Sequence, residues 1–281
     1  MRILVLSDSE SSAERLYTEN GLSLYIEFPD TQILFGFGSG DKFIRNARRL
    51  KVELTNVTAV LPHARSCVAG GFAQFSKIHP RTPVFAQKTA VREYLTGRGM
   101  FKTNDSPAFE SLKHHIGRIT LFPAFTQLHP QLFAVQPKLF APPPSCAVKN
   151  YVREGADGVI NADSFEHEIM LVAFPTGRRR DGCVVVTSCC RRGLPNLLDT
   201  VRYYWDDAPV ISVIGGFHFT DAKGKLICAP ADITDAAAAA RKHVSGSVYV
   251  CNCGGGKGYE RFEEHLAHQT ERLRCGEELS F

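Results

Sequence analysis

The chain has 281 residues, of which 44% are hydrophobic and 22% charged, and its formal net charge is +4. A chain of this length can bury a sizeable core, as one large domain or two small ones. The small net charge and the scattered Lys and Arg residues argue against nucleic-acid binding. No apolar run approaches the roughly 20 residues of a membrane-spanning helix, and the N-terminal β-like run is too short for a signal peptide. We therefore expect a cytoplasmic protein without membrane or nucleic-acid partners.

The first part of the chain alternates apolar runs with amphipathic segments. These patterns predict strands at 3–6, 22–28, 32–35, 57–61 and 83–86, and helices at 41–50 and 87–95. The nine cysteines are numerous for this length. Without a secretory signal they predict reduced thiols rather than a disulfide framework.

The segment 104–163 is less regular. It is rich in Pro, His and aromatic residues, and Pro142, Pro143 and Pro144 make a stiff break. Short strands fit at 118–122 and 132–135. We interpret the segment as an irregular insertion or lid within a single domain that spans the whole chain.

Regular patterns return in the last part of the chain. They predict strands at 168–174, 183–187, 210–214 and 248–251, and helices at 194–204, 235–240 and 259–273. Asp181 and Gly182 predict a hairpin turn. Both halves are βαβ-like, which favours a layered α/β protein.

The most informative motif is the run from Leu61 to Gly71, which contains His63, Arg65, Cys67 and Val68 before two glycines. It resembles the metal-binding loop of the metallo-β-lactamase superfamily, which reads Ser-His-x-His-x-Asp-His-x-Gly-Gly. Other separated segments are similar to the dihydropterin-ribofuranosyl-aminobenzene-phosphate synthase-like branch of that superfamily: 19–23, 33–38, 187–194, 214–219 and 252–255. The resemblance implies a four-layer αββα sandwich of two mixed sheets with helices outside.

The resemblance also implies two sets of metal ligands, and this chain has replaced most of them. The first set falls on His63, Arg65 and Arg191, and the second on Cys67, Val68 and Asn252. Zinc needs three or four nitrogen, sulfur or oxygen donors, and a guanidinium cannot ligate a metal. We therefore expect a degenerate site with no dinuclear centre and no cofactor, as in a pseudoenzyme.

Our first hypothesis is an anion-binding pocket. It is formed by Arg65, Arg191, Lys257, Asn252 and His218. Guanidinium groups bind phosphate or carboxylate in two-pronged fashion, and a glycine-rich turn before a helix favours anions. The ligand would be small, and phosphorylated or pterin-like by the resemblance. An equally weighted alternative is that Arg65 and Arg191 pair with nearby carboxylates.

Other readings of the same residues stay open. A divergent hydrolase or transferase could use one zinc or iron ion held by His63, Cys67, Cys189, Cys253 and His218. Alternatively, Cys67 could be a nucleophile with His63 or His218 as its base. A non-enzymatic scaffold or a homo-oligomer subunit is the third class.

Overall fold

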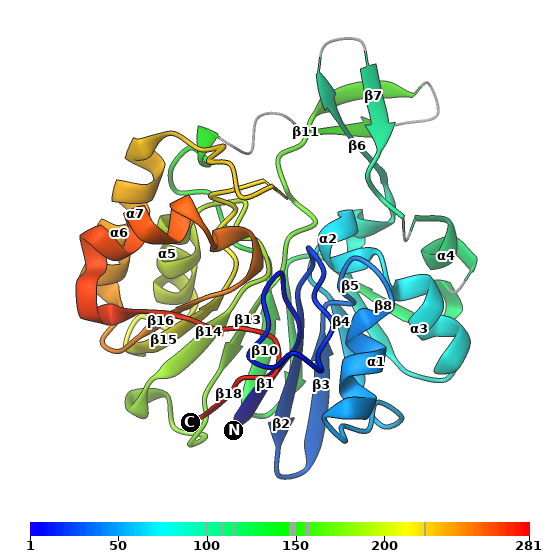
Figure 1. Cartoon of the computed structure of the whole chain (residues 1–281), viewed down its shortest axis with the longest axis horizontal. Helices are drawn as coiled ribbons and strands as arrows, with labels where there is room; N and C mark the ends of the chain where they lie inside the picture. Colours follow the sequence, from blue (N-terminus) through cyan, green and yellow to red (C-terminus); the bar gives the residue numbers. More distant parts are fainter. Residues whose placement is uncertain (99–100, 108, 115, 146–149, 155–157, 222) are drawn as a thin grey trace. The chain divides into compact units, whose positions relative to one another are not determined.

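The computed structural model describes the chain except residues 99–100, 108, 115, 146–149, 155–157 and 222. The chain divides into two compact units. Unit 1 comprises Met1–Pro123, Val148–His167 and Arg274–Phe281, and unit 2 comprises Ala124–Ala147 and Glu168–Leu273. Each unit contains one seven-stranded mixed sheet with helices beside it (Figure 1).

The large sheet of unit 1 has the order β18-β1-β2-β3-β4-β5-β8. Its strands are β18 (Glu278–Ser280), β1 (Arg2–Ser7), β2 (Ser23–Phe28), β3 (Thr31–Phe35), β4 (Thr58–Leu61), β5 (Val84–Gln87) and β8 (Ile119–Phe122). The strands from β18 to β3 pair antiparallel, and those from β3 to β8 pair parallel.

Short helices complete unit 1, namely α1 (Lys42–Arg49), α2 (Ser66–Ala69), α3 (Phe72–Ile78) and α4 (Phe109–His114). Helix α1 buries Phe43, Ile44 and Ala47, which share one helical face. They join a core cluster with Phe72 and Phe75 of α3 and with residues of the sheet. The buried face of each helix is thus set by the spacing of its apolar residues.

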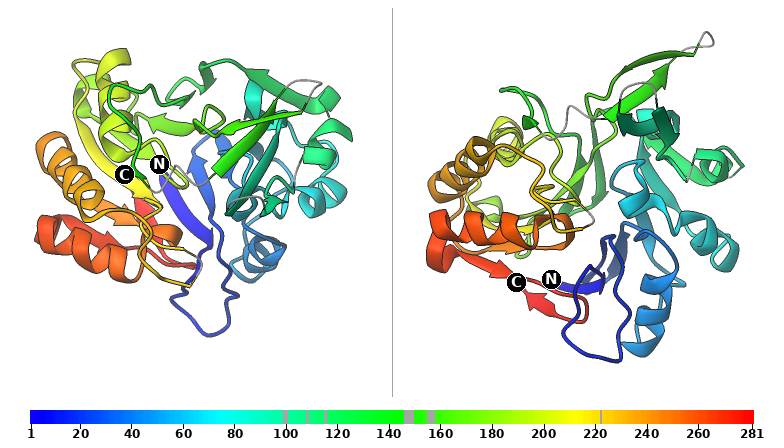
Figure 2. Two further views of the ribbon diagram at one scale, coloured as in Figure 1. Left: turned by 90° about the horizontal axis from the view of Figure 1, so that it is seen from above. Right: turned by 45° about the horizontal axis from the view of Figure 1, so that its top comes forward.

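Unit 1 also contains a small antiparallel sheet of four strands, in the order β12-β11-β6-β7. Its strands are β12 (Val159–Ala162), β11 (Asn150–Glu154), β6 (Glu93–Arg98) and β7 (Phe101–Asn104). This small sheet extends away from the rest of unit 1 (Figure 2). The helix predicted at 87–95 is wrong: the chain makes a short 3-10 helix at Lys88–Val91 and then enters β6. Pairing of β6 with two neighbouring strands overrides the local helical pattern.

The sheet of unit 2 has the order β17-β16-β15-β14-β13-β10-β9. Its strands are β17 (Thr270–Arg272), β16 (Val248–Val250), β15 (Val210–Gly215), β14 (Cys183–Val186), β13 (Met170–Ala173), β10 (Leu132–Val135) and β9 (Phe125–His129). Strands β14 to β17 are parallel, and the others are antiparallel to their neighbours. The predicted hairpin turn joins β13 to β14.

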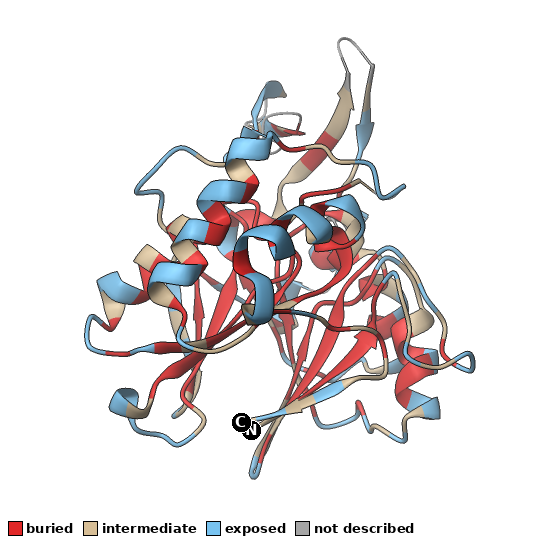
Figure 3. Cartoon of the chain, turned by 60° about the vertical axis from the view of Figure 1, so that its left-hand side comes forward, coloured by how far each residue is buried: buried red, intermediate tan, exposed pale blue. Residues whose placement is uncertain are grey.

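Three helices lie together over one face of this sheet: α5 (Leu194–Tyr204), α6 (Pro230–His243) and α7 (Lys257–Leu266) (Figure 1). The helix predicted at 259–273 ends at Leu266, because the chain then pairs with β16 as strand β17. The central strands of the two seven-stranded sheets are mostly buried, while the helices expose their outer sides (Figure 3).

The segment 104–163 is divided among the three sheets rather than forming one insertion. It supplies β8 to the large sheet of unit 1, β9 and β10 to unit 2, and β11 and β12 to the small sheet. Its role as a lid stays a prediction. Of the helices in the described parts of the chain, none combines the length and apolar character that crossing a bilayer would need.

Candidate functional site

The loop after β4 carries the first group of predicted site residues, all in unit 1. His63 is fully buried, and its Nδ1 accepts a hydrogen bond from the Arg65 N–H at 3.1 Å. A neutral imidazole that accepts at Nδ1 carries its hydrogen on Nε2. That Nε2 lies 3.8 Å from the Cys67 Sγ, at the start of α2. His63 and Cys67 are therefore within hydrogen-bond distance for a sulfur atom.

Arg65 is a fully buried side chain, and its guanidinium is bound by the protein itself. It donates to Asp163 Oδ2 at 2.5 Å and to Asp105 Oδ2 at 3.3 Å. It also donates to the carbonyl oxygens of Leu95 in β6 at 2.9 Å and Tyr151 in β11 at 3.3 Å. Arg65 therefore ties the loop after β4 to the small sheet. These contacts agree with the alternative that Arg65 pairs with nearby carboxylates.

Asp163 is the main counter-charge of Arg65. Burial alone would raise the pKa of the Asp163 carboxyl, but His167 and Arg65 hold that pKa well below its usual range. His167 Nδ1 accepts from the Ala64 N–H at 2.9 Å, and its Nε2 lies 3.2 Å from Asp163 Oδ2. Arg65, whose guanidinium is always charged, forms an ion pair with Asp163.

Two residues of this loop cannot ligate a metal ion. Of the positions that the resemblance assigns to metal ligands, Val68 is apolar and buried and Arg65 is a cation already paired with Asp163. His63 Nε2 and Cys67 Sγ, 3.8 Å apart, are both atoms of the kind that ligate a metal. A metal would need those sites to present lone pairs. Arg65 and Val68 offer no such lone pair, whereas His63 and Cys67 can offer one each.

The second group of predicted residues follows the parallel strands of unit 2. The C-terminal ends of β14, β15 and β16 lie at one edge of the sheet, which is where open α/β sheets bind ligands. Soon after each strand comes a non-glycine residue in the left-handed region: Cys190 (φ 49°), His218 (φ 51°) and Asn252 (φ 40°). Such conformations cost about 1–3 kcal/mol each and cluster at functional sites.

Hydrogen bonds join the three loops to one another. The Gly216 N–H donates to the Ser188 carbonyl oxygen at 3.2 Å, and the His218 N–H donates to Cys253 Sγ at 3.3 Å. A Cβ at Gly216 would lie 2.5 Å from that Ser188 oxygen and 2.7 Å from Cys253 Sγ. The close approach of the loops therefore requires glycine at this position. We call this group of loops the β14–β16 edge.

A buried carboxylate fixes the first loop of the β14–β16 edge. Glu168 Oε1 accepts from the Arg191 N–H at 2.7 Å, and Oε2 accepts from the Arg192 N–H at 2.9 Å. Burial raises the pKa of the Glu168 carboxyl, although the two amides act against that rise. The Arg192 guanidinium donates to the Pro137 carbonyl oxygen. These two hydrogen bonds from Glu168 fix the backbone at Arg191.

The predicted site residues therefore fall into two groups. Unit 1 holds His63, Arg65 and Cys67, and unit 2 holds Cys189, Arg191, His218, Asn252, Cys253 and Lys257. Lys257 is exposed at the first turn of α7, whereas Asn252 and Arg191 are buried. The sequence reasoning missed the roles of Asp163 and Glu168. Their signal in the sequence is two carboxylates placed shortly before strand β13.

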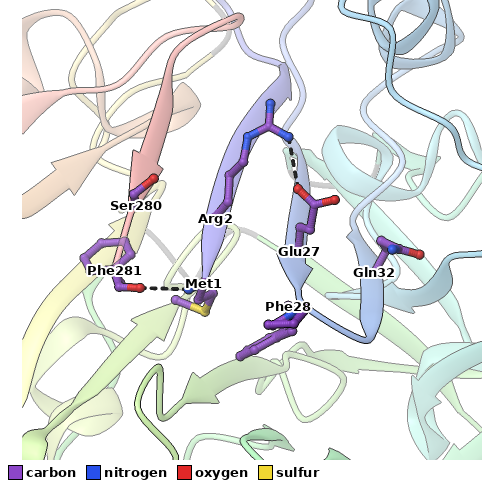
Figure 4. Close-up of a pocket in the computed structure, with 8 residues that line it drawn as sticks. Met1, Arg2, Glu27, Phe28, Gln32, Ser280 and Phe281 are labelled. Carbon is purple, nitrogen blue, oxygen red and sulfur yellow. Dashed lines mark hydrogen bonds and ion pairs between the residues drawn. The ribbon is translucent and has the colours of Figure 1, made fainter.

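A separate cavity of about 340 Å³ lies at another part of unit 1. It is lined mainly by chain ends and by the β2–β3 turn, with an ion pair between Arg2 and Glu27 at 3.1 Å (Figure 4). Because β3 and β4 are parallel, this turn lies at the end of the sheet opposite to His63. The cavity contains none of the predicted site residues.

Comparison with models of protein families found no match, and no curated protein matched. Solved structures do match over the full length. Tm1679, a metal-dependent hydrolase of the β-lactamase superfamily, superposes with a TM-score of 0.80 at 24% identity, covering 100% of this chain and 99% of that one. Zn²⁺-bound PqqB from Methylobacterium extorquens gives 0.57 at 10% identity, covering 100% of both chains. A diphosphatase of the PhnP family gives 0.55 at 10% identity, covering 100% and 97%. The predicted fold class is confirmed: the chain has the metallo-β-lactamase fold.

Proposed function

We propose that this protein binds a small anion at the β14–β16 edge of unit 2 and does not use the dinuclear metal chemistry of its fold. The observation that carries the proposal is the strained backbone there. Three adjacent parallel strands each lead into a non-glycine residue with positive φ, at Cys190, His218 and Asn252. Strain repeated on neighbouring loops is a mark of a ligand site.

The charges near this edge support an anionic ligand. Arg191 directly follows the strained Cys190, and Lys257 begins α7, just beyond Asn252. The negative charge of Glu168 is satisfied by two backbone amides. Arg65 is left out of the proposed site, because its guanidinium is bound to Asp163 and Asp105 in unit 1. A phosphorylated ligand suits Arg191 and Lys257, and a pterin-like group remains part of the proposal by resemblance.

Binding of inorganic phosphate and pyrophosphate, measured by calorimetry, tests the anion site. Pyrophosphate is a suitable probe because one structural neighbour is a diphosphatase. We expect Arg191→Gln to weaken binding about tenfold or more, since a hydrogen bond to a charged group contributes about 1.5–3 kcal/mol. Lys257→Gln should weaken it less, because Lys257 is exposed. Lys242→Gln, an exposed lysine of α6, is the charge-matched control and should change little. Equal affinities of wild type and Arg191→Gln would end the proposal.

Metal analysis tests the second half of the proposal. Protein purified without added metal should contain much less than one equivalent of zinc or iron by mass spectrometry. Stoichiometric metal would instead support the alternative in which one ion is held by His63, Cys67, Cys189, Cys253 and His218. Substitution of His63 and Cys67 would then remove the metal.

A further inference from the structure

We propose that Glu168 is a built-in anion of unit 2, whose carboxylate fills a backbone anion nest and so positions Arg191 for an external ligand. The positioning of a ligand rests on the function proposed above, whereas the occupied nest does not. Glu168 is a positioning residue, because it acts through the backbone of Arg191.

The nest is formed by two consecutive amides that converge on one carboxylate. The Arg191 and Arg192 N–H groups donate to the two oxygens of Glu168, at 2.7 and 2.9 Å. Cys190, just before them, has φ 49°. Successive N–H groups beside a left-handed residue form the concave sites that bind anions in many proteins. Here the anion belongs to the chain itself.

The loop is secured on its other side by Asn196 of α5. The Asn196 side-chain amide donates to the Arg192 carbonyl oxygen at 2.7 Å and to the Ala141 carbonyl oxygen at 3.0 Å. Its Oδ1 accepts from the N–H groups of Phe140 and Ala141. Glu168 thus holds the amides of the loop while Asn196 holds a carbonyl, and the backbone of Arg191 has little freedom.

This arrangement decides what an external anion can contact. The amides of Arg191 and Arg192 already donate to Glu168, so an external anion cannot bind this nest while Glu168 occupies it. A fully buried carboxylate is costly, and burial raises the pKa of Glu168. The two hydrogen bonds from the buried Arg191 and Arg192 amides offset this cost, because each amide would lose its acceptor without the carboxylate.

Amide NMR of the whole protein tests the nest directly. In wild type we expect the Arg191 and Arg192 amide protons to resonate downfield, as charge-assisted donors do. Glu168→Ala should move both signals upfield, and added formate should restore them by entering the vacated space. If Glu168→Ala does not fold, Glu168→Gln replaces it in the test. The glutamine side chain has one acceptor oxygen for the two amide donors, so one of the two signals should move.

Two results would overturn the assignment of Glu168. In one, both amide signals stay in place in Glu168→Gln. In the other, Glu168→Ala folds but its Arg191 and Arg192 signals do not respond to formate. Phosphate titration then tests the ligand-positioning part. Glu168→Gln should weaken phosphate binding at least about tenfold, since small displacements of a binding group are costly. If the nest signals behave as expected but wild type binds no phosphate, the proposed function fails while the occupied nest stands. If wild type binds phosphate and Glu168→Gln binds it equally well, the positioning role fails.

Discussion

Replacing Arg65 with Met tests whether its guanidinium is a structural element of unit 1. Met has a similar length and fills the same apolar space beside Tyr94 and Phe165, whose rings lie 5.3 and 5.6 Å from the Arg65 guanidinium carbon. What is lost is the charge and its hydrogen bonds. Asp163, whose side chain is only 3% exposed, then remains buried without its cation.

The expected loss follows from the burial of that pair. Removing one partner of a buried ion pair costs about 3–5 kcal/mol, because the other charge stays in a poorly solvated place. Two further acceptors, the carbonyl oxygens of Leu95 and Tyr151, also lose their donor. Since whole domains are stable by only about 5–15 kcal/mol, this loss should be obvious in urea unfolding.

The assay compares urea midpoints by circular dichroism and hydrogen exchange of β6 and β11. Arg65→Met should lower the midpoint of unit 1 and speed exchange in both strands. Arg153→Met is the matched control in the same small sheet: its pair with Glu93 is partly exposed and contributes about 0–1 kcal/mol. Adding Asp163→Asn to Arg65→Met should recover part of the loss. Equal midpoints for wild type and Arg65→Met, with unchanged exchange, would refute the structural role.

The remaining predictions concern the loop after β4 and its charges. Among the eight described cysteines only Cys67 is not buried, so in a Cys146→Ala background it should react first with a disulfide reagent, and Cys67→Ser should remove the fast phase. A uniform, slow reaction would contradict this. Because the folded pKa of Asp163 is depressed, its stabilising effect is present above its unfolded pKa of about 4 and is lost as the pH falls through lower values. Urea midpoints from pH 6 to 3 should therefore fall more steeply for wild type than for Asp163→Asn, and parallel curves would argue against it.

Much of the secondary structure could be predicted because it depends on local pattern. The helix predicted at 194–204 has the bounds of α5, since its buried residues recur at helical spacing and Pro195 stands in its first turn. The buried strands β4 and β14 are short apolar runs. Prediction failed at β6 and β17, whose strand character comes from pairing with residues far along the chain. No local pattern encodes such a partner.

The sequence by itself predicts, through its resemblance to the superfamily, that Arg65 and Val68 stand at metal-ligand positions, and residue identity alone excludes a guanidinium or a valine side chain as a donor. It also placed His63 and Arg65 in the loop after a buried strand. Only the tertiary structure decided what their charges do. Asp163, 98 residues further along, is the ion-pair partner of Arg65. Glu168 binds the loop of Arg191 from 23 residues away. Coulomb attraction and desolvation depend on distance in space and on burial, and neither is fixed until the strands have paired.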